Sequence, residues 1–158
     1  MESFTQIRYN TAMNKRKLLW LLPLSITLFA FFNSALPGNE SSKLSFAFLE
    51  FLQSLNISIP VEHLHLFIRK LAHFSEYTAL GFTMFLADYY QSYQFYTIKK
   101  LPLFLIVIPI IDEMIQLFSP GRSAQLTDVL IDYSGIIFGI LLFYLLYRIL
   151  LTKRNQSR

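Results

Sequence analysis

Cysteine is absent from this 158-residue chain, and charged residues are scarce at 15% of the total. Without cysteine the chain cannot be a disulfide-stapled secreted domain, and a soluble domain has about a quarter of its residues charged. Apolar residues make up 54%, which excludes a disordered chain because disorder needs low hydrophobicity and high charge. Glycine-rich phosphate loops, cysteine-based zinc spacings and nucleophile elbows are also missing. These absences leave an integral membrane protein.

Four apolar runs are each long enough to cross a bilayer, which takes about 20 helical residues. The runs cover residues 18–36, 71–90, 101–118 and 129–151. The first run follows the basic cluster Lys15-Arg16-Lys17, so a cleaved signal peptide is the alternative interpretation. We favour an uncleaved span because three further spans follow it.

The basic residues are divided unequally between the two sides of this arrangement. With the N-terminus inside, ten of the 14 Lys and Arg residues fall on inner segments and four on outer segments. Basic residues concentrate on the cytoplasmic side of membrane proteins. The asymmetry predicts cytoplasmic termini, with residues 1–17 and 152–158 flanking one domain of residues 18–151. The net charge of +4 therefore indicates orientation and not nucleic-acid binding.

The outer segment between the first two spans is too apolar for a plain loop. Its apolar residues at helical spacing are Leu44, Phe48, Phe51, Leu52 and Leu55. This stripe predicts a helix that lies on the outer leaflet. Ser58 and Pro60 then predict another helix start, which can continue into the second span. The predicted fold is all-α and polytopic: four transmembrane helices with an outer interfacial helix between the first two.

Polar side chains lie within three of the spans, although each inserted carboxylate costs about 2.5–3.5 kcal/mol. They are Lys70, His73, Glu76 and Tyr77 in the second span, Asp112, Glu113 and Gln116 in the third, and Asp128 and Asp132 in the fourth. The topology brings all three groups to the outer half of the bilayer, beside Arg122 in the turn between the last two spans. The sequence therefore predicts one polar pocket that is open to the exterior. Gly135 and Gly139 predict a close-packing helix face.

The same residues resemble two family signatures. Residues 70–81 resemble the K-x-x-H-F-x-x-Y-x-x-L-G signature of the VanZ-like family. The second signature is matched by Asp112-Glu113-x-x-Gln116, Gly121-Arg122, Asp128-Val129-Leu130 and the pair Gly135 and Gly139. One position departs from the family: Asp132 stands where the family often has asparagine, and it adds a possible negative charge.

The resemblance implies a small polytopic protein of the bacterial cell membrane. The named member of the family is associated with resistance to teicoplanin-type glycopeptide antibiotics. We therefore expect a role in glycopeptide resistance or in the handling of cell-envelope precursors. The expected partners are membrane lipids, together with a lipid-linked envelope precursor or a glycopeptide. The resemblance implies no established reaction.

Two functional classes fit the pocket. The first is an enzyme that acts on an envelope lipid or precursor at the outer face. Its candidate catalytic residues are His73, Glu76, Asp112, Glu113 and Asp128, and its candidate ligand-binding residues are Lys70, Tyr77, Gln116, Arg122 and Asp132. The second class is a non-enzymatic protein that binds a lipid, peptide or antibiotic, or that transports a substrate with protonatable carboxylates.

Simpler interpretations compete with both classes. The ionic groups can form a buried network that only locks the helices together, and Asp128 can act as a helix cap. A divalent metal held by His73 and the acids ranks lower, because the His-x-x-Glu pair lacks a recognised second ligand motif. We therefore predict no metal and no cofactor from the sequence.

Overall fold

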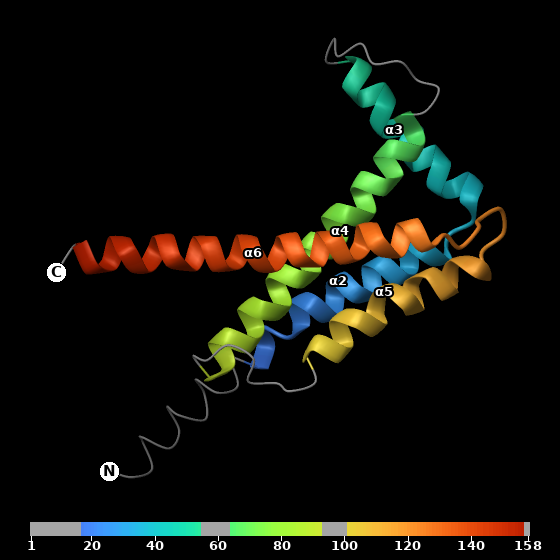
Figure 1. Cartoon of the computed structure of the whole chain (residues 1–158). Coiled ribbons are helices and arrows are strands. Elements are labelled where there is room, and N and C mark those ends of the chain that lie inside the picture. Colours follow the sequence, from blue (N-terminus) through green and yellow to red (C-terminus); the bar gives the residue numbers. More distant parts are fainter. Residues whose placement is uncertain (1–16, 55–63, 93–100, 157–158) are drawn as a thin grey trace.

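The computed structural model describes residues 17–54, 64–92 and 101–156, and it is all-helical over these ranges. Its helices are α2 (Leu21–Ala35), α3 (Gly38–Ser54), α4 (Leu64–Ser92), α5 (Leu101–Leu117) and α6 (Leu126–Gln156). Figure 1 shows α2 and α5 side by side, with α4 crossing α6. The described residues contain no strand, which confirms the predicted all-α class.

Each predicted apolar run coincides with one helix. The first run falls on α2, the second on α4, the third on α5 and the fourth on α6. The predicted outer helix is α3, although Leu55 and the predicted start at Ser58 and Pro60 lie outside the described residues. Helix α6 continues to Gln156, past the predicted end of its span at residue 151. The placement of α3 on a membrane surface stays a prediction.

Length and apolarity distinguish α6 from the other helices. Within the described ranges, α6 is the helix that is long and apolar enough to cross a bilayer alone, over Leu126–Lys153. Helices α2 and α5 have 15 and 17 residues, which is short for a bilayer. Helix α2 and Gly38–Phe48 of α3 meet the same criterion only as a pair, and they are bent by 109°. The four-span topology is therefore still a prediction.

Glycines allow α4 and α6 to cross in close contact. A Cβ atom added to Gly135 would lie 2.6 Å from the backbone oxygen of Phe74. One added to Gly139 would overlap with the backbone oxygen of Thr78, and one on Gly81 would overlap with that of Ile136. The backbones can approach this closely only where no side chain intervenes. The crossing confirms the predicted packing face of Gly135 and Gly139.

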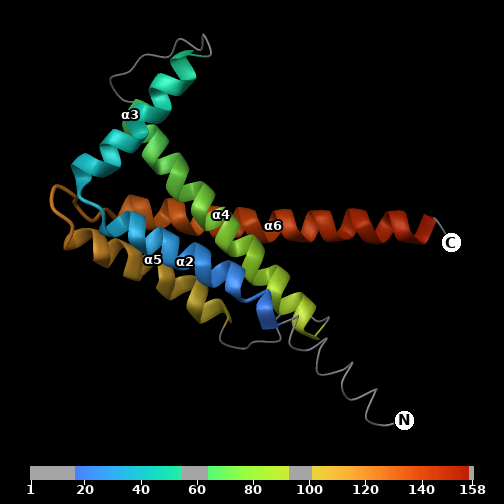
Figure 2. The ribbon, with the colours of Figure 1, turned by 180° about the vertical axis from the view of Figure 1, so that it is seen from behind.

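Apolar side chains of α4, α5 and α6 form the core next to this crossing. The buried cluster consists of Tyr77, Leu80, Met84, Phe85, Leu101, Leu105, Ile108, Ile136 and Phe143. Beyond the crossing, α6 diverges from the other helices (Figure 2), although Tyr147 still contacts Tyr89 of α4. There Leu141 and Leu150 are 59% and 67% exposed. A contiguous apolar surface of this kind is typical of contact with lipid or a partner.

A turn with a left-handed residue connects α5 to α6 and positions Arg122. Gly121 has φ = 73°, a conformation that glycine adopts without strain. The N–H of Gly38 donates to the backbone oxygen of Pro120 at 2.9 Å, which joins the α2–α3 break to this turn. The contact holds Arg122 over the ends of α2 and α5.

Candidate functional site

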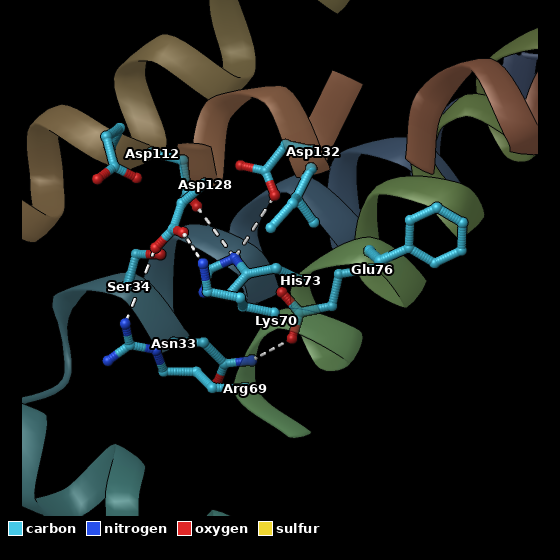
Figure 3. Close-up of polar contacts among 12 residues, drawn as sticks. Asn33, Ser34, Arg69, Lys70, His73, Glu76, Asp112, Asp128 and Asp132 are labelled. Carbon is cyan, nitrogen blue, oxygen red and sulfur yellow. Dashed lines mark hydrogen bonds and ion pairs between the residues drawn. The ribbon is translucent and has the colours of Figure 1, made fainter. Parts of the chain in front are cut away.

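The polar residues of α4, α5 and α6 come together where α2 and α5 end and α6 begins (Figure 3). Those that are buried are His73, Tyr77, Asp112, Glu113, Gln116, Asp128 and Asp132. Lys70, Glu76 and Arg122 are partly buried beside them. The structure thus brings together side chains that the sequence separates by as many as 62 positions, from Lys70 to Asp132.

Two cations of α4 neutralise the first acid of α6. Lys70 Nζ lies 3.3 Å from Asp128 Oδ1, and Arg69 Nη2 lies 3.8 Å from Asp128 Oδ2. Asp128 stands in the first turn of α6, where a carboxylate also favours the positive end of the helix dipole. This ion-pair group joins α4 to α6 and occupies both carboxylate oxygens of Asp128.

A second group of buried side chains has polar atoms that lie close together but form no hydrogen bonds with one another. His73 Nδ1 lies 3.8 Å from Asp112 Oδ2 and 3.8 Å from Asp132 Oδ1. These distances exceed the 3.2 Å limit of an ordinary hydrogen bond. His73 Nδ1 and both carboxylate oxygens of each aspartate are buried without a hydrogen-bond partner, as is the hydroxyl of Tyr77. We call His73, Asp112 and Asp132 the histidine–aspartate cluster.

Helix α2 supplies hydrogen bonds to the site from its last turn. Asn33 Nδ2 donates to Glu76 Oε1 at 2.7 Å, and the backbone oxygen of Asn33 accepts from Arg122 Nη2 at 2.8 Å. Gln116 Nε2 donates to Ser34 Oγ at 3.5 Å. Glu76 therefore bonds to α2, whereas the ion-pair contacts of His73 are with acids of α5 and α6.

The remaining predicted acid anchors the chain between α5 and α6. The backbone N–H of Gln125 donates to Glu113 Oε1, while Glu113 Oε2 is buried without a partner. Glu113 is thus tied to the segment that leads into α6. Its role in the structure is to hold this loop beside the site.

A small cavity of about 170 Å³ opens beside these groups. Its polar lining consists of Asn33, Ser41, Ser45, Arg69, His73, Glu76 and Arg122. Nε and Nη1 of Arg122 are buried without a hydrogen-bond partner. Burial, followed by the positive charge of Arg69, lowers the pKa of Arg122 below its ordinary value. An anion in the cavity would relieve both effects, because it supplies acceptors and negative charge. We call this the arginine cavity.

Three residues of the site escaped the sequence analysis. Arg69 directly precedes Lys70 at the start of the second apolar run. Its positive charge at that position was the signal that could have identified it. Asn33 and Ser34 form a polar pair near the end of the first apolar run. That pair lies on the predicted outer side, as the other polar groups do.

The described residues form a helical bundle with a cluster of buried polar side chains at one end. The model of the family VanZ/LLP1 matches residues 19–147, which is more than half of the chain. The chain therefore belongs to this family, and the resemblance found in the two signatures is confirmed. No curated protein and no solved structure matches the chain.

Proposed function

We propose that the chain is a multi-pass protein of the bacterial cell membrane that binds the anionic headgroup of an envelope lipid or lipid-linked precursor at the outer face. Through this binding it contributes to resistance to teicoplanin-type glycopeptides. The observation that carries the proposal is Arg122, whose Nε and Nη1 are buried without a partner beside the arginine cavity. A buried guanidinium with unused donors favours a phosphate or a carboxylate.

The size of the cavity limits the ligand. At about 170 Å³ it is smaller than the roughly 300–1,000 Å³ of pockets for drug-sized molecules. It can admit a phosphate or carboxylate group, but not an entire glycopeptide. The proposed route to resistance is therefore through the lipid or precursor and not through capture of the antibiotic.

Membrane insertion is the premise of this proposal, and the lack of native cysteine makes it direct to test. We expect single cysteines at Ser41 and Ser123 to react with an impermeant thiol reagent in intact cells. A cysteine at Ser92, at the other end of α4, should stay unlabelled until the cells are permeabilised. Labelling of Ser92 alone would place the arginine cavity on the cytoplasmic side and overturn the proposed outer site.

Substitution of Arg122 tests the anion site itself. We expect Arg122→Lys to weaken binding of phosphatidylglycerol vesicles by about tenfold or more, because it loses at least one charge-assisted hydrogen bond worth about 1.5 kcal/mol. Arg122→Gln should abolish binding, and teicoplanin resistance of expressing cells should fall in the same order. Arg148→Lys, on the exposed far half of α6, is the matched control and should change neither.

The same series can contradict the proposal. Wild-type binding in Arg122→Lys, with loss in Arg122→Gln, would show that charge alone matters and would remove the guanidinium from the ligand site. Competition by inorganic phosphate distinguishes recognition of the phosphate group from general adhesion to an anionic surface.

Catalysis on the bound headgroup is the second candidate function. The observation that favours it is the position of His73, which lines the arginine cavity and also lies 3.8 Å from an oxygen of each of two buried carboxyl groups. A histidine in that position can transfer protons to or from a bound group. Hydrolysis of a phosphorylated lipid by water, which breaks a P–O bond and releases inorganic phosphate, should be lost in His73→Ala while vesicle binding persists if this candidate is right.

A further inference from the structure

We infer that His73, Asp112 and Asp132 form a binding site for one divalent transition-metal ion of the zinc and manganese class. The site goes beyond the proposed headgroup binding and does not rest on it. It uses one nitrogen and two carboxylate oxygens from α4, α5 and α6. Figure 3 shows these side chains converging from separate helices.

The distances between the donor atoms fit a shared ion. Zinc bonds to nitrogen and oxygen at about 2.0–2.2 Å, so two of its ligand atoms lie at most about 4 Å apart. His73 Nδ1 lies 3.8 Å from an oxygen of each aspartate, and all three donors lie within 4.8 Å of one another. The spacing is too wide for direct hydrogen bonds and close to what a common metal ion requires. A separation of up to 4.8 Å exceeds this limit, so binding of the ion requires the donor oxygens to move closer together.

The burial of the cluster supplies a second and independent argument. The side chain of His73 is 9% exposed and those of Asp112 and Asp132 are 0% exposed. All four carboxylate oxygens and His73 Nδ1 lack a hydrogen-bond partner. An unsatisfied buried polar group costs about 1–3 kcal/mol, and an unpaired buried charge costs more. A metal ion would satisfy three of these atoms at once.

The charges around the histidine–aspartate cluster also favour a bound cation. The nearby cations of α4 are engaged elsewhere, since Arg69 and Lys70 form ion pairs with Asp128. Arg122 lines the arginine cavity and donates to the backbone oxygen of Asn33, and neither aspartate is its salt-bridge partner. Among the described residues, no Lys or Arg forms a salt bridge with Asp112 or Asp132. A divalent ion brings the two positive charges that would balance two ionised carboxylates.

The mixed donor set identifies the class of metal. Imidazole suits zinc and other first-row transition metals, whereas calcium and magnesium prefer oxygen ligands alone. Three protein ligands leave at least one coordination position free, as in catalytic zinc sites. Because His73 also lines the arginine cavity, that cavity gives an ion a route to the cluster. The competing explanation is that protons, and not a metal, neutralise the two aspartates.

Metal analysis of the full-length protein in detergent tests the site. We expect protein equilibrated with zinc or manganese, and then freed of excess metal, to retain one ion per chain. His73→Ala, Asp112→Asn and Asp132→Asn should each weaken retention by more than about 100-fold, because loss of even an outer-shell partner costs 10–100-fold. Added metal should raise the melting temperature of the wild type but not that of Asp132→Asn.

Two matched controls keep the test specific. Asp88→Asn replaces another buried acid of α4, 15 residues from His73, and should retain the ion. Glu76→Gln should also retain the ion. Loss of the ion in this variant would mean that His73 and Glu76 form the site instead. Asp132→Asn preserves the shape of the side chain, so it answers the question even where His73→Ala fails to fold.

The outcomes separate this inference from the proposed function. Retention of the ion in Arg122→Gln, which should lose headgroup binding, would show that the two sites fail independently. A wild type that retains no metal, or an Asp132→Asn variant that retains as much as the wild type, would overturn the inference. Protonated aspartates would then be the explanation of the buried cluster.

Discussion

Two neighbouring regions along α4 and α6 are built in opposite ways. At the glycine crossing the backbones touch, and farther along Tyr89 and Tyr147 are joined through their hydroxyl groups at 2.8 Å. At the histidine–aspartate cluster the polar atoms are just as buried, yet they lack hydrogen bonds. Buried polar groups without partners lower stability, so proteins retain them chiefly where function requires them. The comparison separates residues that hold the helices together from residues held in place for a ligand.

The largest expected effect is at the crossing. We expect Gly139→Leu to lower the free energy of unfolding by about 3 kcal/mol or more, because the added side chain would overlap with the backbone of Thr78 and push the helices apart. Thermal unfolding in detergent, together with the yield of folded protein in membranes, measures this change. Ile137→Leu is the control, since Ile137 is 58% exposed on the same helix. Wild-type stability of Gly139→Leu would mean that the crossing is not closely packed.

The cluster should respond in the opposite direction. In protein freed of metal by a chelator, we expect Asp112→Asn and Asp132→Asn to leave the free energy of unfolding unchanged or to raise it by up to about 2 kcal/mol. Each substitution replaces a buried carboxyl group that has no hydrogen-bond partner with a neutral amide, so no hydrogen bond is lost. Resistance of expressing cells should nevertheless be lost. Chelated protein is needed because a bound ion would stabilise the wild type alone.

The contrary result has a clear meaning. If His73→Ala and Asp112→Asn lower stability in proportion to their loss of resistance, the cluster is a structural network that locks the helices. Headgroup binding, measured with the same variants, then reports only how much folded protein is present.

The sequence predicted the helices well because long apolar runs identify them directly. All four runs coincide with helices, and so does the amphipathic segment that became α3. The predicted topology also placed the polar groups of α4, α5 and α6 together, because it assigned the helix ends that carry them to the same side of the membrane. The hydrogen bond from Gly38, at the α2–α3 break, to Pro120 was not predicted, because it depends on a turn far away in the chain.

The partners within the site could not be predicted in the same way. Helical spacing suggested that Glu76 would accompany His73, since the two lie three residues apart. The structure instead bonds Glu76 to Asn33 and brings Asp132 to His73. Spacing tells which residues share a face of one helix, but contacts between helices depend on the crossing angle and on rotation about each axis. Asp132 on α6 is thus next to His73 on α4.

The smallest expected effect is at the hydrogen bond between Tyr89 and Tyr147. Tyr147→Phe removes the hydrogen bond with Tyr89 while keeping the ring, and we expect it to lower the free energy of unfolding by about 1 kcal/mol. A double-mutant cycle with Tyr89→Phe isolates the bond from the other contacts of the two rings, and the second substitution should add little to the first. The sign of the change in the free energy of unfolding is informative. Loss of one polar group should lower this free energy at Tyr147, but should leave it unchanged or raise it at Asp132. Fully additive losses for the two tyrosines would show that the hydroxyl groups are not coupled. The paired and unpaired regions would then no longer differ in how their polar groups contribute to stability.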